Sequence, residues 1–269
     1  MLFSIYIDDL VGEVIKADIG CYISSMCVSI FLFADDILLV SPTVTGLQCL
    51  LNVCESELCK LDMQVNTKKS MCIRFGQRFE DKCADLTSNQ GTIQWVSSCR
   101  YLGVFFVSGR TFKCSFDNAK SKFFRAFNAL YSKVGRSASE EVVITLLRVK
   151  CLPILLYGTE ACPLSSRDRQ SIEFAITRIF MKVFRTGSPA IVAECQRFFN
   201  FLSISQQIAI RSATFLQRFS ASENLLCSLF SAKTTNEIRN LFSVYGNGLQ
   251  TACQLRNSIY STLLVSSAQ

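Results

Sequence analysis

The chain has 269 residues, of which 49% are hydrophobic and 22 are phenylalanine. A chain of this length and composition is expected to bury a sizeable core in about two domains, which excludes an intrinsically disordered protein. It has no run of about 18 apolar residues, and its first residues lack the basic flank of a signal peptide. We therefore expect no membrane partner and an intracellular location, nuclear or cytoplasmic.

Histidine is absent, and cysteine is abundant with 14 residues. Without histidine, and without any Cys-x-x-Cys spacing, the usual zinc fingers, zinc knuckles and histidine-dependent catalytic triads are excluded, so no zinc is expected. The cysteines are spread along a large apolar chain rather than concentrated in a small one. We expect reduced, mostly buried thiols instead of a disulfide framework.

Charge divides the chain into two halves. Residues 1–107 carry 8 Lys and Arg against 12 Asp and Glu, a net charge of −4, whereas residues 108–269 carry 20 against 9, a net charge of +11. Such a basic excess is typical of surfaces that bind nucleic acid, although many solvated helices are basic without binding anything.

The first expected element is a helix over residues 1–10, where apolar positions have helical spacing and no N-cap precedes them. The chain is therefore expected to begin inside a domain. Residues 13–25 are expected to form a loop with a short strand near residues 21–23.

Residues 28–41 then place two short apolar runs on either side of Asp35 and Asp36. This pattern predicts two buried strands joined by a tight turn. Buried carboxylates must be paired, protonated or bound to a metal, and Mg²⁺ prefers oxygen ligands, so a metal site is one interpretation. A solvated Asp-Asp turn is the other.

A helix is predicted over residues 43–61, with a leucine-rich apolar stripe and with Glu55 and Glu57 outside it. Residues 66–70 are expected to form a turn that leads into a strand, in which Met71, Ile73 and Phe75 alternate with Cys72 and Arg74. A polar surface connection is expected over residues 79–91, and a hairpin over residues 92–107.

Four blocks stand out in this half: LFSIYIDDL at residues 2–10, FADD at 33–36, VNTKKS at 65–70 and YLGV at 101–104. Together they resemble the palm of reverse transcriptases in their non-LTR (LINE-type) retrotransposon form. Their order and spacing are more specific than any single block. The resemblance implies an α+β fold: a partial polymerase palm over residues 1–107, an antiparallel sheet with a packed helix. Thumb-like helices over 108–164 and a basic helical extension over 165–269 follow.

The resemblance also implies roles for individual residues. Asp35 and Asp36 are implied to bind Mg²⁺ or Mn²⁺, two ions in the intact family, with Asp35 the direct ligand and Asp36 the weaker, partly structural one. Lys69 is implied to lie near the incoming triphosphate as a proton donor to pyrophosphate, with an ordinary exposed turn lysine as the alternative. The hairpin implied to hold the primer 3′ end contains Tyr101, Leu102 and Gly103. The fingers and the first catalytic block are expected to be absent.

Beyond residue 108, helices are predicted over residues 113–134, from 137 to Pro153, over 165–187 and over 203–219. Residues 152–162, LPILLYGTEAC, are similar to a P-x-L-x-Y-G-x-E segment that follows the polymerase region in many LINE-type proteins. From residue 221 onward we expect short helices and a frayed tail. The basic residues expected to contact nucleic acid are Lys120, Lys122, Arg125, Lys133, Arg178, Lys182 and Arg185.

These observations predict a fragment of an RNA-directed DNA polymerase whose partners are an RNA template, a DNA primer and deoxynucleoside triphosphates. Alone, it is expected to polymerise poorly or not at all, because the first catalytic block is expected to be missing. Two alternatives remain open. One is a non-catalytic nucleic-acid-binding remnant that uses the basic C-terminal helices, and the other is a decayed reading frame that folds badly.

Overall fold

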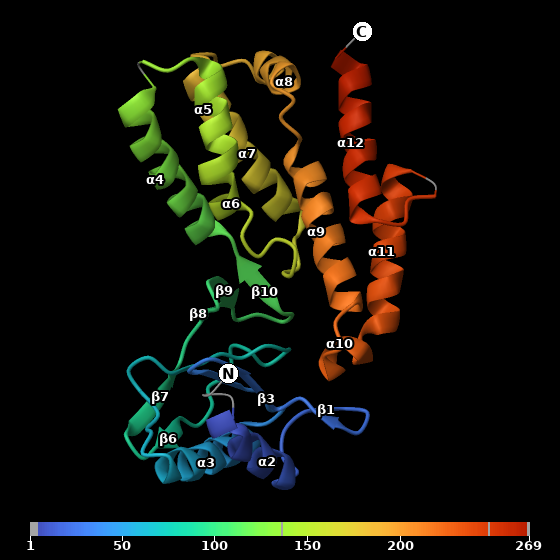
Figure 1. Ribbon diagram of the computed structural model, residues 1–269. Helices are drawn as coiled ribbons and strands as arrows, with labels where there is room; N and C mark the ends of the chain where they lie inside the picture. The colour runs from blue at the N-terminus through green and yellow to red at the C-terminus, as the bar shows by residue number, and fades with distance from the viewer. Residues whose placement is uncertain (1–4, 136, 247, 268–269) are drawn as a thin grey trace. The chain divides into compact units, whose positions relative to one another are not determined.

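The computed structural model describes residues 5–135, 137–246 and 248–267, with side chains described as far as residue 262. The chain divides into two compact units (Figure 1). The first unit contains Met1–Cys99 and Val107–Phe112, and the second contains Arg100–Phe106 and Lys113–Gln269. Helices and small sheets occur together, which confirms the predicted α+β class. The first four residues of the helix predicted over 1–10 lie outside the described part of the chain.

The first unit is built on two helices that pack against each other, α2 (Asp8–Lys16) and α3 (Val44–Lys60). The prediction of a loop from residue 13 is wrong, because α2 continues to Lys16 and buries Val14. The strand expected near residues 21–23 is present as β1 (Tyr22–Ile23), which pairs with β2 (Met26–Cys27).

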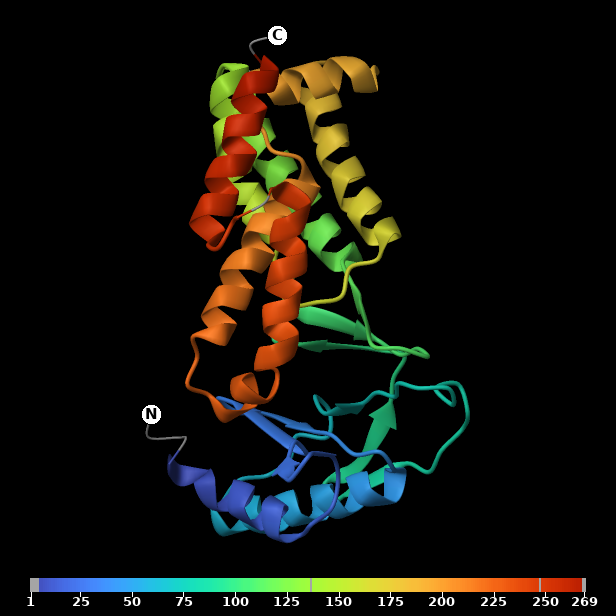
Figure 2. The same cartoon turned by 90° about the vertical axis from the view of Figure 1, so that its right-hand side faces the viewer.

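Strands β3 (Ile30–Phe33) and β4 (Asp36–Leu39) form an antiparallel hairpin. In Figures 1 and 2, α2 and α3 lie on the same side of this hairpin. The register pairs Ile30 with Leu39 and Leu32 with Ile37. These four side chains are partly buried against the core formed by the two helices. The hairpin therefore has one face packed on helices.

Helix α3 begins where it was predicted, because the Thr43 side chain accepts a hydrogen bond of 3.0 Å from the Gly46 N–H. The placement of Glu55 outside the apolar stripe is wrong, since Glu55 is 8% exposed. Its carboxylate accepts hydrogen bonds from the Ser88 hydroxyl and the Asn89 N–H. Three long-range hydrogen-bond contacts thus offset the cost of burying this charge.

A second sheet in the first unit has the strand order β5 (Met71–Cys72), β7 (Gly91–Trp95) and β6 (Leu86–Ser88). β5 runs parallel to β7, and β6 runs antiparallel to it. The predicted strand is shorter than expected, and its alternation is reversed at residues 71 and 72, because Cys72 is 7% exposed and Met71 is 49% exposed. Residues 73–75 follow β5 and are all half-buried. The surface connection predicted over 79–91 is also wrong, since it contains β6 and buries Leu86.

The hairpin predicted over residues 92–107 is divided between two sheets. β7 belongs to the sheet with β5, whereas β8 (Ser98–Tyr101) and β9 (Val104–Val107) join β10 (Lys113–Ser115) in the order β10-β9-β8. The helix predicted from residue 113 therefore begins four residues later, because residues 113–115 are used by β10.

The second unit is mainly helical, and its largest core surrounds the fully buried rings of Phe123, Phe127 and Phe180. Its first elements are α4 (Asp117–Val134), α5 (Glu140–Leu146), the π-helical turn η1 (Leu147–Cys151), α6 (Leu152–Leu155), α7 (Ser166–Val183) and α8 (Pro189–Phe198).

The helix predicted from 137 to Pro153 is interrupted earlier and does not end at the proline. Its first part, α5, ends at Leu146. The chain passes through η1 and continues as α6, with Pro153 near the start of α6. A π turn widens the hydrogen-bonding pattern to i→i+5, which is one way for a helical chain to accommodate proline, which lacks an N–H donor. Helix α7 begins as predicted, with Ser165 and Asp168 forming a capping box.

The C-terminal part is more ordered than predicted. Its elements are α9 (Ile204–Ser220), α10 (Leu225–Leu229), α11 (Ser231–Tyr245) and α12 (Ala252–Ser267). In Figures 1 and 2, α9, α11 and α12 lie side by side (orange to red). They enclose a core that includes Ala213, Phe242 and Leu255. The prediction of short helices after residue 221 is confirmed for α10, which has 5 residues, and is wrong for α11 and α12, which have 15 and 16. The end of the expected frayed tail, residues 268–269, lies outside the described residues. Across the described ranges, no helix is long and apolar enough to span a membrane.

Candidate metal and nucleic-acid sites

The carboxylate pair lies at the tip of the β3–β4 hairpin. β3 ends at Phe33 and β4 begins at Asp36, so Ala34 and Asp35 form a two-residue turn. Ala34 has a φ of 52°. Two-residue hairpin turns whose twist matches that of the strands require a positive φ at this first turn position. An alanine with positive φ is strained, and strained backbone is found most often at functional sites.

The strand register sets the direction of Asp36. Ile30, Leu32, Ile37 and Leu39 pack toward α2 and α3. Because successive side chains alternate across a strand, Asp36 lies on the opposite face, as does Phe33, its partner in the register. The hairpin therefore directs Asp36 away from the helices.

Both Asp35 and Asp36 are exposed, so the buried environment assumed for the metal interpretation is wrong, and the exposure agrees with the alternative of a solvated Asp-Asp turn. They lie beyond the apolar part of each strand, where the chain reverses. Burial therefore does not require a metal here, and the argument for a metal rests on the donor atoms themselves.

Those donor atoms fit an open magnesium site. Two adjacent carboxylates supply hard oxygen ligands, and neither forms a hydrogen bond or ion pair with any described residue. Among the described residues, no group of three or more His, Cys, Asp or Glu side chains is close enough to enclose a metal ion. Mg²⁺ usually keeps several waters and is bound by one or two carboxylates together with substrate phosphates, so an incomplete protein shell is compatible with it.

Lys69 lies on a turn that Asn66 organises. The Asn66 side-chain oxygen accepts hydrogen bonds from the N–H groups of Lys68 at 3.1 Å and Lys69 at 3.3 Å. The Asn66 carbonyl also accepts from Ser70 at 2.9 Å. These bonds explain why an asparagine suits the first position of the Asn-x-x-Lys-Ser block. The Lys69 side chain is exposed and makes no hydrogen bond or ion pair with the described carboxylates Asp35 and Asp36.

The block Tyr101-Leu102-Gly103 forms the tip of the β8–β9 hairpin. Leu102 and Gly103 are its two turn residues, with φ values of 46° and 85°. Positive φ at both positions defines the type I′ turn, which favours glycine at the second position. The Tyr101 ring lies 6.0 Å from the Phe106 ring. Leu102 is exposed at the tip, where it is accessible to a ligand.

The predicted basic residues fall into two groups. Three of them on α4, Lys122, Arg125 and Lys133, are exposed and lie within one arc of the helix at about 100° per residue. The others that are exposed lie on or just after α7: Arg178, Lys182 and Arg185.

Direct contacts connect the two helices. The Lys182 ammonium donates a hydrogen bond of 2.8 Å to the Asn128 side chain on α4, and it lies 5.4 Å from the centre of the Tyr131 ring. Arg125 precedes Asn128 by three residues, so the two side chains are neighbours on the surface of α4. The basic residues of α4 and α7 therefore form a shared surface, here called the α4–α7 basic face: Lys122, Arg125, Arg178 and Lys182.

Lys120 is not part of this face. Its ammonium donates a hydrogen bond of 2.6 Å to Ser171 and forms an ion pair of 2.8 Å with Asp117. This contact also lowers the pKa of the Asp117 carboxyl. Lys120 thus ties the start of α4 to α7.

Burial makes three of the thiols poor nucleophiles. All 14 cysteines are free, and eight of them are half-buried rather than mostly buried as predicted. Burial raises the pKa of Cys54 and of Cys114 to about 12, and that of Cys72 to about 11. These three thiols stay protonated at neutral pH, which argues against cysteine chemistry at them.

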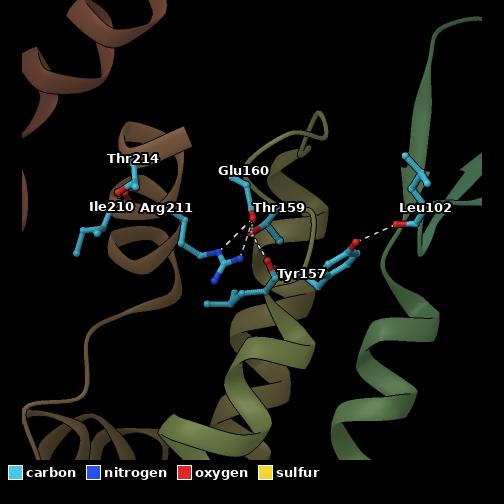
Figure 3. Close-up of polar contacts among 8 residues, drawn as sticks. Leu102, Tyr157, Thr159, Glu160, Ile210, Arg211 and Thr214 are labelled. Atoms are coloured by element: carbon cyan, nitrogen blue, oxygen red, sulfur yellow. Dashed lines mark hydrogen bonds and ion pairs between the residues drawn. The ribbon is translucent and has the colours of Figure 1, made fainter. Parts of the chain in front are cut away.

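Sequence reasoning missed the residues that hold the 101–103 hairpin tip. The Tyr157 hydroxyl donates a hydrogen bond of 2.9 Å to the Leu102 carbonyl, and Arg211 binds Glu160 through two nitrogens, at 2.8 and 3.1 Å (Figure 3). Tyr157 and Glu160 belong to the P-x-L-x-Y-G-x-E segment, so the signal was present. No spacing rule, however, predicts a partner 55 residues away.

A strand hairpin tipped by two carboxylates, packed on two helices and followed by basic helices, is an arrangement suited to phosphate-containing ligands. Residues 1–106 match a protein-family model described as reverse transcriptase (RNA-dependent DNA polymerase). This match supports the reverse transcriptase family for that part of the chain, a family that generally uses divalent metal ions and acts on a nucleic-acid template with nucleotides. No curated protein matches the chain.

Proposed function

We propose that this chain is the palm and thumb part of a non-LTR (LINE-type) reverse transcriptase. The observation that carries the proposal is the exposed Asp35–Asp36 pair at a strained hairpin tip, within the residues that match the reverse transcriptase model. We further propose a palm over 1–107, a thumb over 108–164 and a helical extension over 165–269.

In this proposal, Asp35 and Asp36 are the residues that would hold Mg²⁺, with Asp35 as the direct ligand. When bound, the metal would activate the primer 3′-hydroxyl and neutralise charge on the triphosphate. Lys69 is on the turn that Asn66 orders. It would lie near the triphosphate and donate a proton from its ammonium to the leaving pyrophosphate. The turn Tyr101-Leu102-Gly103 would hold the primer 3′ end.

Primer extension tests the catalytic part of the proposal. With poly(rA), oligo(dT) and Mg²⁺, we expect weak incorporation of dTTP by the full chain, which falls to background in Asp35→Asn because the variant loses one carboxylate charge at the metal. Asp85→Asn is the matched control, since Asp85 is also an exposed aspartate of the first unit and should leave incorporation unchanged. Incorporation that persists in Asp35→Asn would contradict the assignment.

A second candidate is a nucleic-acid-binding remnant without chemistry. The α4–α7 basic face favours it, because four exposed cationic side chains gather there in a half of the chain with a net charge of +11. A surface of this kind binds phosphates without reading base sequence.

The salt dependence of RNA binding tests this face. The double variant Arg178→Gln, Lys182→Gln should reduce the slope of log K against log salt by about 2, since each lost phosphate contact removes about one released counterion. Lys233→Gln, Arg239→Gln removes the same charge from exposed positions of α11 and should leave the slope near that of the unmodified chain. Equal slopes for the two double variants would exclude a special role of the α4–α7 basic face. Binding that survives Asp35→Asn, without incorporation by the unmodified chain, would favour the remnant.

A further inference from the structure

The tip of the β8–β9 hairpin is held by a segment more than fifty residues away. The Tyr157 hydroxyl donates its hydrogen bond directly to the Leu102 carbonyl, at 2.9 Å (Figure 3). Leu102 is a turn residue with positive φ, which a leucine adopts only when surrounding contacts hold it. All of these residues belong to the second unit.

Two glycines allow the hairpin and the segment to approach closely. A Cβ on Gly103 would lie 2.9 Å from a ring carbon of Tyr157, and a Cβ on Gly158 would lie 2.9 Å from a methyl carbon of Val104. Both glycines also have positive φ, 85° and 78°. The two segments therefore pack closely at two points. The missing side chain of Gly103 leaves room for the Tyr157 ring, and the missing side chain of Gly158 leaves room for Val104.

The same segment continues to the C-terminal helices. Thr159, which is buried, donates to the Leu156 carbonyl at 2.8 Å, and this bond orders the turn. The next residue, Glu160, receives the two-nitrogen contact from Arg211 of α9. Figure 3 shows Tyr157 pointing toward Leu102 and Glu160 pointing toward Arg211. Residues 157–160 thus connect the hairpin tip to α9.

We propose that Tyr157 is a positioning residue for the turn Tyr101-Leu102-Gly103, and that residues 157–160 are the link through which α9 fixes this turn. The assignment rests on the proposed function, in which the turn holds the primer 3′ end. Tyr157 acts through the Leu102 carbonyl. Its loss should affect the recognition of a primer end more than the general attraction between basic helices and phosphates.

The test compares two ligands of the full chain: an RNA template annealed to a DNA primer with a recessed 3′ end, and a blunt duplex of the same length. In Tyr157→Phe, the preference for the recessed end should fall about five-fold, the effect of one lost hydrogen bond. Blunt-duplex affinity should stay within about two-fold, because the α4–α7 basic face is unchanged. Hydrogen exchange in residues 98–107 should also become faster, since the turn loses its restraint.

Two further variants complete the test. Tyr260→Phe removes the same hydroxyl group from α12 and should change neither the preference nor the exchange. Gly103→Ala places a Cβ against the Tyr157 ring and should also reduce the preference for the recessed end. It therefore tests the same contact if Tyr157→Phe fails to fold.

The possible failures are distinguishable. Preference and exchange unchanged in Tyr157→Phe would overturn the positioning role and leave the proposed function intact. An unmodified chain that binds both duplexes equally, or neither, would overturn the primer-holding role itself and this assignment with it.

Discussion

Replacing Phe180 by alanine is expected to lower the free energy of unfolding of the helical unit by about 3–5 kcal/mol. Phe180 is fully buried, and its ring packs edge-on against Phe201 at a centroid distance of 5.0 Å and stacks with Phe184 at 5.8 Å. Alanine would leave a cavity at the junction of α7 with the residues that precede α9. Urea unfolding followed by the circular dichroism of the helices measures this change.

Phe198→Ala is the matched control for this prediction. Phe198 is 80% exposed, and its ring contact is with the neighbouring Phe199. Its loss should cost less than about 1 kcal/mol, because little apolar area returns to water. Equal losses in the two variants would mean that the aromatic core around Phe180 does not determine the stability of the second unit.

Replacing Gly158 by alanine is expected to destabilise the second unit by about 2–4 kcal/mol. Its φ of 78° costs an L residue about 1–2 kcal/mol, and the new Cβ at 2.9 Å from Val104 adds a steric cost of similar size. Thermal unfolding of the full chain should show a midpoint lowered by several degrees, with the hairpin of residues 98–107 exchanging its amide hydrogens faster.

Two variants separate the causes of this effect. Adding Val104→Ala to Gly158→Ala removes the overlap but not the backbone strain, so it should recover only part of the lost stability. Gly187→Ala should be near neutral or slightly stabilising, because nothing lies within 4 Å of the added Cβ and the backbone has no positive φ. A loss in Gly187→Ala as large as in Gly158→Ala would contradict the explanation by close approach.

The sequence predicted best where a local signal is sufficient. Helices α3 and α7 begin within one residue of the predicted starts at 43 and 165, because the Thr43 and Ser165 side chains accept hydrogen bonds from backbone N–H groups only three residues away. The two-residue turn at Ala34-Asp35 joins the two apolar runs of residues 28–41, where a tight turn was predicted.

Predictions failed where a distant partner decides the outcome. Glu55 is buried because Ser88 and Asn89, more than 30 residues away, supply its donors. Strand β6 forms because β7 offers it a pairing edge, which the polar composition of residues 79–91 does not reveal. The sequence left a buried metal site and a solvated turn open for Asp35 and Asp36, and the exposure follows from the position of the turn beyond the packed strand residues.

The path of the chain through β8, β9 and β10 has a practical consequence for dissecting the protein. Residues 100–106 are assigned to the helical unit, yet the residues before and directly after them belong to the strand-containing unit. No single cleavage site can therefore release either half intact, and an expression boundary near residue 107 would separate the hairpin from the tyrosine that supports it. A separate helical unit would need residues 100–106, which contain the tip of the β8–β9 hairpin, joined directly to the piece that contains α4 and α9.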